Sequence, residues 1–108
     1  MTYVIDIDGT ICESDTGFGG DYHNMKPLHG RIQKINELYD YGHKIVYFTA
    51  RGMGRHSNNQ ARAIQDFYTL TQNQLKDWGA KYHQLILGKP SGDVYIDDKG
   101  VKDSDFFK

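Results

Sequence analysis

The sequence predicts a single α/β domain with a short parallel sheet, and three observations carry that prediction. Short apolar segments rich in β-branched and aromatic residues alternate with two longer segments in which apolar residues recur at helical spacing. Strands separated by helices in this way pair in parallel through right-handed crossovers. The 108 residues match one ordinary domain, and no repeat, low-complexity tract or linker divides them. We therefore treat residues 1–108 as one domain.

The first half of the chain gives one strand, one long loop and one helix. Residues 3–7 form a β-branched and aromatic strand that ends in the turn Asp8-Gly9-Thr10. Residues 11–26 lack periodicity, and a loop of this length in a small domain is uncommon unless it is functional, so we expect a flap. Pro27 suits the first position of a helix that ends at Gly42. Its apolar positions are Ile32, Ile35, Leu38 and Tyr39.

The second half predicts a second helix and three more strands, which completes a βαβαββ order. Strands are expected over residues 43–48, 85–87 and 94–96, and each is followed by a polar turn. Ser57 or Asn58 would cap a helix that ends at Gly79. We expect the strands to be buried on both faces. The apolar face of this second helix would carry Ile64, Phe67, Tyr68, Thr71, Leu75 and Trp78.

Composition excludes several classes of protein. With 38% hydrophobic and 25% charged residues, the chain is globular rather than disordered. One cysteine excludes a disulfide framework and any multi-cysteine zinc site. No apolar run approaches the ~18 residues of a membrane span, and the start shows no signal-peptide pattern. We expect a cytoplasmic protein without a membrane partner.

The formal net charge of −1 argues against a generic nucleic-acid binder, but the charge is unevenly distributed. Residues 1–21 and 93–108 together hold ten acidic and three basic residues, whereas residues 22–92 hold four acidic and ten basic residues. We therefore expect the acidic residues at the two ends of the chain to lie at a specific site in the fold.

Polar residues follow every predicted strand, and a buried strand does not need them. In an open parallel sheet, ligands bind at the carboxyl edge of the strands, so we expect these residues to converge there. Clustered carboxylates repel one another, and oxygen-only ligands favour Mg²⁺ over Ca²⁺ or Zn²⁺. Such an ion beside cations and a hydroxyl makes a site for a phosphoryl group. The converging residues are Asp6 and Asp8, Thr49 and Arg51, Lys89, and Asp97 and Asp98.

Carboxylates at such a site can carry out phosphoryl transfer. One carboxylate can attack phosphorus to form an aspartyl phosphate. A second carboxylate, two residues further on, can protonate the leaving group and then activate water. The ordered set Asp6-Ile7-Asp8-Gly9-Thr10, Thr49, Lys89 and Asp97-Asp98 resembles the haloacid dehalogenase superfamily of phosphotransferases, from Tyr3 to about Asp103. The resemblance implies the three-layer, Rossmann-like fold of that superfamily.

The resemblance also implies a role for each catalytic residue. Asp6 would be the nucleophile and a Mg²⁺ ligand. Asp8 would be the general acid/base and would bind Mg²⁺ through its backbone carbonyl. Thr49 would bind the phosphoryl oxygens, and Lys89 would neutralise both the nucleophile and the phosphoryl group.

The remaining implied roles concern the metal and the substrate. Asp98 would be the direct metal ligand of the acidic pair, with Asp97 supporting it, although the sequence does not decide between them. Asp103 is a candidate outer-shell partner. Arg51 resembles a substrate-phosphate contact, because a similar arginine follows this motif in phage-type polynucleotide kinase phosphatases.

Three short runs resemble those of very small members of the superfamily that lack a cap domain, among them phosphatases of capsule and polysaccharide biosynthesis. The runs are Phe48-Thr49-Ala50-Arg51, Gly88-Lys89-Pro90 and Tyr95-Ile96-Asp97-Asp98-Lys99. The sequence has no cap insertion, and we expect the usual last strand and helix to be absent. Since the cap normally supplies specificity, the identity of the substrate stays open.

The sequence favours a Mg²⁺-dependent phosphomonoester hydrolase acting on a small phosphorylated metabolite such as a sugar phosphate. One alternative is a phosphatase acting on nucleic-acid ends, which the basic middle segment supports if Lys26, Arg51, Arg55 and Arg62 form one patch. Another is a receiver-like signalling module, but receivers carry their paired acids first and their lysine last. Phe106 and Phe107 are expected to dock on the domain or on another subunit, so a homo-oligomer stays open.

Overall fold

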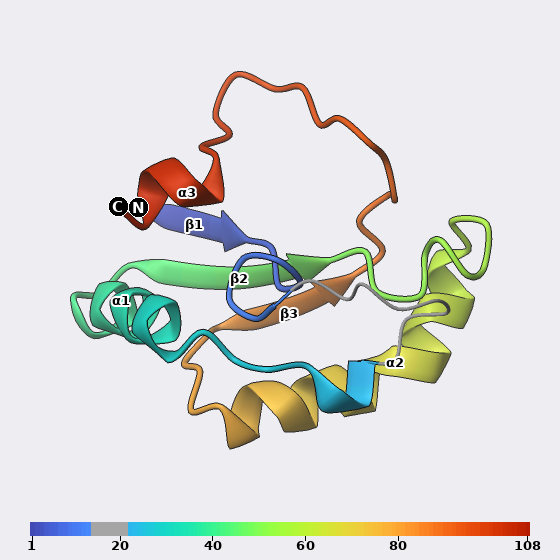
Figure 1. Ribbon diagram of the computed structural model, residues 1–108, viewed down its shortest axis with the longest axis horizontal. Coiled ribbons are helices and arrows are strands. Elements are labelled where there is room, and N and C mark those ends of the chain that lie inside the picture. Colours follow the sequence, from blue (N-terminus) through green and yellow to red (C-terminus); the bar gives the residue numbers. More distant parts are fainter. Residues whose placement is uncertain (14–21) are drawn as a thin grey trace.

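The computed structural model describes residues 1–13 and 22–108, and a three-stranded parallel sheet lies at its centre (Figure 1). The strands are β1 (Thr2–Ile5), β2 (Lys44–Thr49) and β3 (Gln84–Leu87), and they lie side by side in the order β1-β2-β3. This confirms the predicted α/β class with a short parallel sheet. The expected flap over 11–26 includes residues 14–21, which lie outside the described residues.

Helices connect the strands close to the predicted positions, with small shifts at their starts. The described helices are η1 (Tyr22–Asn24), α1 (His29–Asp40), α2 (Gln60–Asp77) and α3 (Asp103–Phe106). Helix α1 begins two residues after Pro27. The cap of α2 is Asn59, whose side chain accepts the N–H of Arg62 at 3.2 Å. Ser57 and Asn58 have φ of 52° and 63°, a left-handed conformation that an N-cap does not use.

The core lies on one face of the sheet. Side chains alternate along a strand, and the register places Ile5 opposite Tyr47 and Tyr47 opposite Leu85. Both long helices pack on that same face, because their buried residues join the strand residues in one cluster. The members from the strands and from these two helices are Ile5, Ile45, Tyr47, Leu85, Leu87, Ile32, Ile35, Phe67 and Leu75.

The opposite face, which we call the open face, carries Val4, Val46, Phe48 and Ile86. Val4 is 63% exposed and Ile86 is 40% exposed, whereas Val46 of the central strand is 5% exposed. Burial on both faces is therefore confirmed for β2 and wrong for β1 and β3, and the described residues show no third layer. The described residues form two layers. The physical reason is that residues 88–102 contain no helix that could cover this face.

The predicted fourth strand, residues 94–96, is also wrong for this chain. We call residues 88–102 the arm; it leaves β3, arches away from the sheet and returns at α3 (Figure 1). Val94 is 74% exposed and Ile96 is 91% exposed. Only six residues separate Leu87 from Val94, whereas a parallel crossover needs a dozen or more. The chain is too short here to return and pair beside β1.

The last turn of the chain closes over α1, beside β1. Lys34 Nζ lies 4.7 Å from the centre of the Phe106 ring, and the Arg31 guanidinium lies 4.7 Å from that of Phe107. Arg31 also pairs with Asp103 at 2.7 Å and lowers the pKa of that carboxyl. The two phenylalanines therefore dock on the domain, and the two termini lie close together (Figure 1). No helix within the described ranges is long and apolar enough to cross a membrane.

Candidate active site

A tight turn after β1 presents the first pair of carboxylates. The carbonyl of Ile7 accepts the N–H groups of Thr10 at 3.0 Å and Ile11 at 2.9 Å. Gly9 has φ 79°, a conformation that favours glycine. Ile7 is fully buried, while Asp6 and Asp8 on either side of it remain partly exposed. Ile7 therefore packs in the core and holds the turn in place, while both carboxylates lie at the carboxyl edge of the sheet.

Asp6 lies between a hydroxyl and a cation. The Thr10 hydroxyl donates to Asp6 Oδ2 at 3.4 Å, and Lys89 Nζ lies 3.7 Å from Oδ1. Burial raises the pKa of Asp6 above its ordinary value, and the charge of Lys89 opposes that rise. A carboxylate that is partly desolvated beside one cation has the surroundings expected of a nucleophile.

The position of Lys89 follows from the way β3 ends. The N–H groups of Gly88 and Lys89 both donate to the carbonyl of Thr49, each at 3.2 Å. Gly88 has φ 111°, a conformation that favours glycine. The chain turns at this residue and carries Lys89 toward Asp6. Lys89 Nζ also lies 4.4 Å from the centre of the Tyr95 ring.

Asp8 is held by Arg51 through several hydrogen bonds. Arg51 Nε donates to Asp8 Oδ1 at 3.2 Å and to Oδ2 at 3.1 Å, and its NH2 group donates to Oδ1 at 2.9 Å. The thiol of Cys12 donates to the same carboxylate at 3.4 Å. Burial raises the pKa of that thiol to about 12, so Cys12 acts as a donor and not as a nucleophile.

Arg51 differs from its expected role as a substrate-phosphate contact. Its side chain is fully buried, and its NH1 group donates to Thr71 Oγ1 at 3.2 Å and to Gln74 Oε1 at 2.5 Å. The guanidinium also lies 4.9 Å from the centre of the Tyr22 ring. In this arrangement the donors of Arg51 are directed at Asp8 and at α2, and Arg51 fixes the position of Asp8.

Sequence reasoning missed the side chains that support Arg51, although a signal was present. Thr71 and Gln74 are buried polar residues on the face of α2 that packs on the sheet. Gln74 also donates through Nε2 to the carbonyl of Tyr22. Polar residues at core-facing positions of an amphipathic helix indicate a buried partner that they satisfy, and that partner is Arg51.

Thr49 lies at the end of β2, between the two halves of the site. It is fully buried, its hydroxyl accepts the N–H of Arg51 at 3.1 Å, and its carbonyl receives the turn that carries Lys89. One residue thus joins the Arg51–Asp8 pair to the Lys89–Asp6 pair.

The structure does not bring Asp97 and Asp98 to this cluster. Both are exposed, and the Oδ1 of Asp97 accepts the N–H of Lys99 at 2.8 Å and that of Gly100 at 2.5 Å. Across residues 1–13 and 22–108, no three His, Cys, Asp or Glu side chains lie close enough to hold a metal ion. The expected convergence of all four carboxylates is therefore not met within one chain. Asp103 pairs with Arg31, which also donates to the carbonyl of Thr10 at 3.1 Å.

The chemistry of the donors still fits Mg²⁺. This ion is usually held by only one or two carboxylates, and water and substrate phosphate supply the other ligands. The only side-chain hydrogen bond to Asp6 among the described residues is the long one from Thr10, which leaves acceptor capacity on both of its oxygens. Asp6 is thus the residue in this part of the chain best suited to hold such an ion.

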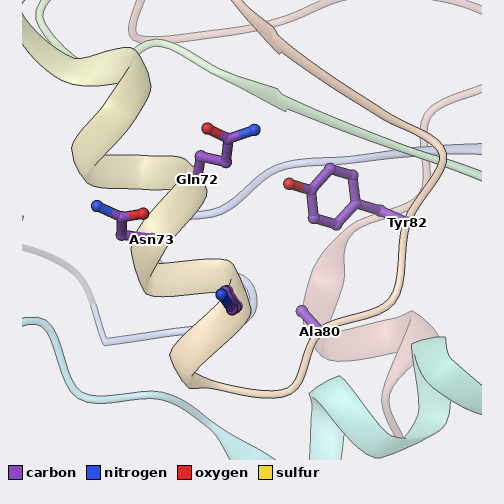
Figure 2. A pocket seen from close by; sticks show the side chains of 5 residues that line it. Gln72, Asn73, Ala80 and Tyr82 are labelled. Carbon is purple, nitrogen blue, oxygen red and sulfur yellow. The ribbon is translucent and has the colours of Figure 1, made fainter.

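A hollow elsewhere on the molecule does not belong to this site. Figure 2 shows Gln72 of α2 on the side of the helix toward Tyr82, Asn73 on the side away from it, and Ala80 below Tyr82; Lys76 completes the lining. These residues come from the second half of α2 and from the segment that enters β3, so the hollow lies toward the amino end of the sheet. Its lining contains no carboxylate.

Comparison with known proteins gives matches in structure only. No family model matches the chain, and no curated protein does. A structural-genomics target from Vibrio cholerae superposes with a TM-score of 0.88 at 28% identity, over 98% of this chain and 86% of the other. D,D-heptose 1,7-bisphosphate phosphatase from B. bronchiseptica, complexed with magnesium and phosphate, superposes with a TM-score of 0.55 at 16% identity, over 85% of this chain. The match spans about half of that phosphatase, 51% of its length, and it supports the haloacid dehalogenase-like fold expected from the motifs.

Proposed function

We propose that this protein is a Mg²⁺-dependent phosphomonoester hydrolase that works through an aspartyl-phosphate intermediate. The observation that carries the proposal is the placement of Asp6, partly buried at the carboxyl edge of the sheet, with Lys89 Nζ at 3.7 Å and the Thr10 hydroxyl at 3.4 Å. The structural likeness to a phosphatase that binds magnesium and phosphate supports the same reaction class.

The proposed reaction has two steps. A carboxylate oxygen of Asp6 attacks phosphorus, the bond from phosphorus to the leaving oxygen breaks, and Asp8 gives that oxygen a proton. Asp8 then takes a proton from water, which attacks the aspartyl phosphate and releases inorganic phosphate. Lys89 and Thr49 would offset charge on the phosphoryl oxygens. Asp6 and the backbone carbonyl of Asp8 would hold Mg²⁺, which would supply further positive charge at the phosphoryl group. Asp98 would join them only if its arm were brought to this edge of the sheet.

Small phosphorylated metabolites, with sugar phosphates first among them, are the proposed substrates. The neighbouring phosphatase acts on a heptose bisphosphate. A nucleic-acid end would need a basic surface beside Asp6, and Arg51, one of the four basic residues expected to form it, is buried against Asp8. The structure thus favours the small substrate over the nucleic-acid alternative.

Hydrolysis of an aryl phosphate tests the reaction class. We expect turnover that needs Mg²⁺, stops in EDTA and falls by about 10³-fold or more in Asp6→Asn, since removal of a nucleophile costs at least that much. Asp93→Asn, an exposed carboxylate on the arm, is the matched control and should retain full activity. Intact-mass analysis of Asp8→Asn with substrate should reveal a covalent phosphoryl group.

Two results would overturn the proposal, namely full activity of Asp6→Asn or full activity in EDTA. A substrate panel of sugar phosphates, other phosphorylated metabolites and 3′-phosphorylated oligonucleotides then identifies the class. Turnover of oligonucleotides alone would replace the metabolite proposal with the nucleic-acid one.

A further inference from the structure

Two unpaired features of the same chain complement one another. The first is the free edge of the sheet. Strand β1 pairs only with β2 in the described residues, so the backbone N–H and C=O groups along its other edge have no strand partner. Val4, in the middle of this strand, is 63% exposed. Free edges of this kind accept an added strand readily.

The second feature is the segment Val94-Tyr95-Ile96 in the arm. It is β-branched and aromatic, which favours a strand, yet these residues are 74%, 52% and 91% exposed. A run of consecutive exposed apolar residues indicates either a docking segment or a site prone to aggregation. The segment has the composition of a strand and lacks a sheet to join.

The two features match residue by residue. If Ile96 lay opposite Ile5 in a parallel pair, Val94 would lie opposite Tyr3 on the face that the helices cover, and Tyr95 would lie opposite Val4 on the open face. The next residues, Asp97 and Asp98, would then emerge at the carboxyl edge beside Asp6. This pairing would gather the carboxylates that a single chain leaves apart.

The arm cannot make this pairing within its own chain. A strand beside β1 lies three strand spacings from β3, about 14 Å, and must restart at the amino end of the sheet, about 13 Å back along the strands. The straight distance is about 20 Å, and the path must also rise over the side chains of the sheet. The seven Cα–Cα steps from Leu87 to Val94 span at most about 23–25 Å when fully extended. The turn at Gly88 shortens that reach, so almost no length is left for the detour.

We propose that Val94-Tyr95-Ile96 of a second copy of this chain adds as a parallel strand to the free edge of β1, and that the two copies do so reciprocally. Each active site then receives Asp97 and Asp98 from the other copy. The part that concerns these two carboxylates rests on the proposed function, whereas the strand pairing does not. A reciprocal exchange gives a closed dimer with twofold symmetry.

The mass of the protein in solution tests the pairing without any reference to activity. Native mass spectrometry and light scattering should give twice the chain mass for the wild type. Ile96→Lys should give a monomer, because the lysine would face Ile5 of the other copy, although in a single chain this side chain is 91% exposed and free to change. Val101→Lys, an exposed arm residue outside the segment, should stay dimeric. A monomeric wild type would overturn the proposal.

Cross-linking locates the contact. Val4→Cys and Tyr95→Cys, mixed as two separate chains and oxidised, should form a disulfide between them, while neither variant alone should do so. Tyr41→Cys replaces a residue that is 86% exposed and distant in register, and mixed with Tyr95→Cys it should not cross-link. A Val4–Tyr95 disulfide formed only within a chain that carries both changes would overturn the exchange in favour of closure within one chain.

Complementation tests the shared site. Asp6→Asn and Asp98→Asn should each be inactive, and their co-expression should recover about a quarter of wild-type activity, because in a reciprocal dimer about one site in four then keeps both residues. Active Asp98→Asn, or no recovery from the mixture, would overturn the sharing of Asp98. An inactive wild type that is nonetheless dimeric and cross-links as expected would contradict the proposed function and leave the strand exchange supported.

Discussion

The two acidic pairs near the ends of the chain differ in every aspect of their surroundings. Asp6 and Asp8 are partly buried and each faces a cation, Lys89 or Arg51. Asp97 and Asp98 are exposed on the arm. Burial raises the pKa of Asp6, whereas hydrogen bonds from backbone N–H groups lower that of Asp97. The first pair is organised by its own chain before any ligand arrives, and the second pair is not.

The largest expected effect is on the organised pair. Asp8→Asn should lower kcat/KM for an aryl phosphate by about 10³-fold, within the range that general acid–base groups supply. Asp93→Asn, an exposed carboxylate of the arm, serves as the control. Wild-type turnover by Asp8→Asn would mean that Asp8 has a structural role only. The difference in burial between the two acidic pairs would then not reflect a difference in catalytic role.

The next effect is on stability and comes from the partner of Asp8. Arg51→Ala should lower the free energy of unfolding by about 3 kcal/mol, because it leaves Asp8 without its cation and Thr71 and Gln74 without their donor. Asp8 is 24% exposed, so water can partly solvate its charge after the substitution. The loss of unfolding free energy should therefore be at the lower end of the range for breaking a buried ion pair. Urea unfolding measures it. Arg51→Lys keeps the charge but not the fork of donors, and should lose less.

A smaller effect concerns how stability depends on pH. The pKa of Asp6 is raised and that of Asp97 is lowered, so the two groups change stability with pH in opposite directions. Because the folded pKa of Asp6 lies above its ordinary value of 3.8, the folded state holds this proton more tightly than the unfolded state. Stability should therefore decrease as pH rises from 3.8 through the raised pKa. Asp6→Asn removes this dependence, so the variant should melt higher than the wild type at pH 7 and lose that advantage below 3.8. Melting curves across this range, without added metal, measure it. Equal melting temperatures at pH 7 would show that Lys89 already offsets the cost of burial.

The smallest effect is expected on the arm. Asp97→Ala removes only the hydrogen bonds from two backbone N–H groups at an exposed turn, and the melting temperature at neutral pH should not change measurably. A clear decrease would mean that Asp97 is engaged by something beyond its own chain. That result would sharpen the contrast, because the second pair would then depend on its partner for stability as well as for chemistry.

Local pattern was enough to predict much of this molecule. The spacing of Ile32 and Ile35, or of Phe67 and Leu75, defined the buried faces of both long helices. The Asp-x-Asp-Gly-Thr run fixed the turn after β1, since its conformation depends on neighbours close in sequence. Ile64 was assigned to the apolar face of α2, but it is 40% exposed, because the buried face of this helix begins at Ala63 and continues through Phe67 and Thr71.

Features that depend on distance through space could not be predicted in the same way. The sequence shows Arg51 beside Thr49, but its burial depends on Thr71 and Gln74, twenty residues and more further on. The strand composition of residues 94–96 was recognised correctly, and its pairing was not, because pairing depends on whether a six-residue connection can reach the edge of the sheet. Propensity describes what a segment can become, whereas connection length decides where it can go.

The contact between Lys89, at the start of the arm, and Tyr95, further along it, links the arm to the nucleophile. The same ammonium lies 3.7 Å from Asp6 and 4.4 Å from the centre of the Tyr95 ring. Any event that draws Tyr95 away removes one of two competing attractions on that charge, and the attraction of Asp6 remains. By linkage the effect is mutual: whatever binds Lys89 more tightly at Asp6 also loosens the hold of Lys89 on Tyr95. The position of Tyr95 therefore affects how strongly Lys89 interacts with Asp6, and a ligand bound at Asp6 affects how strongly Lys89 holds Tyr95.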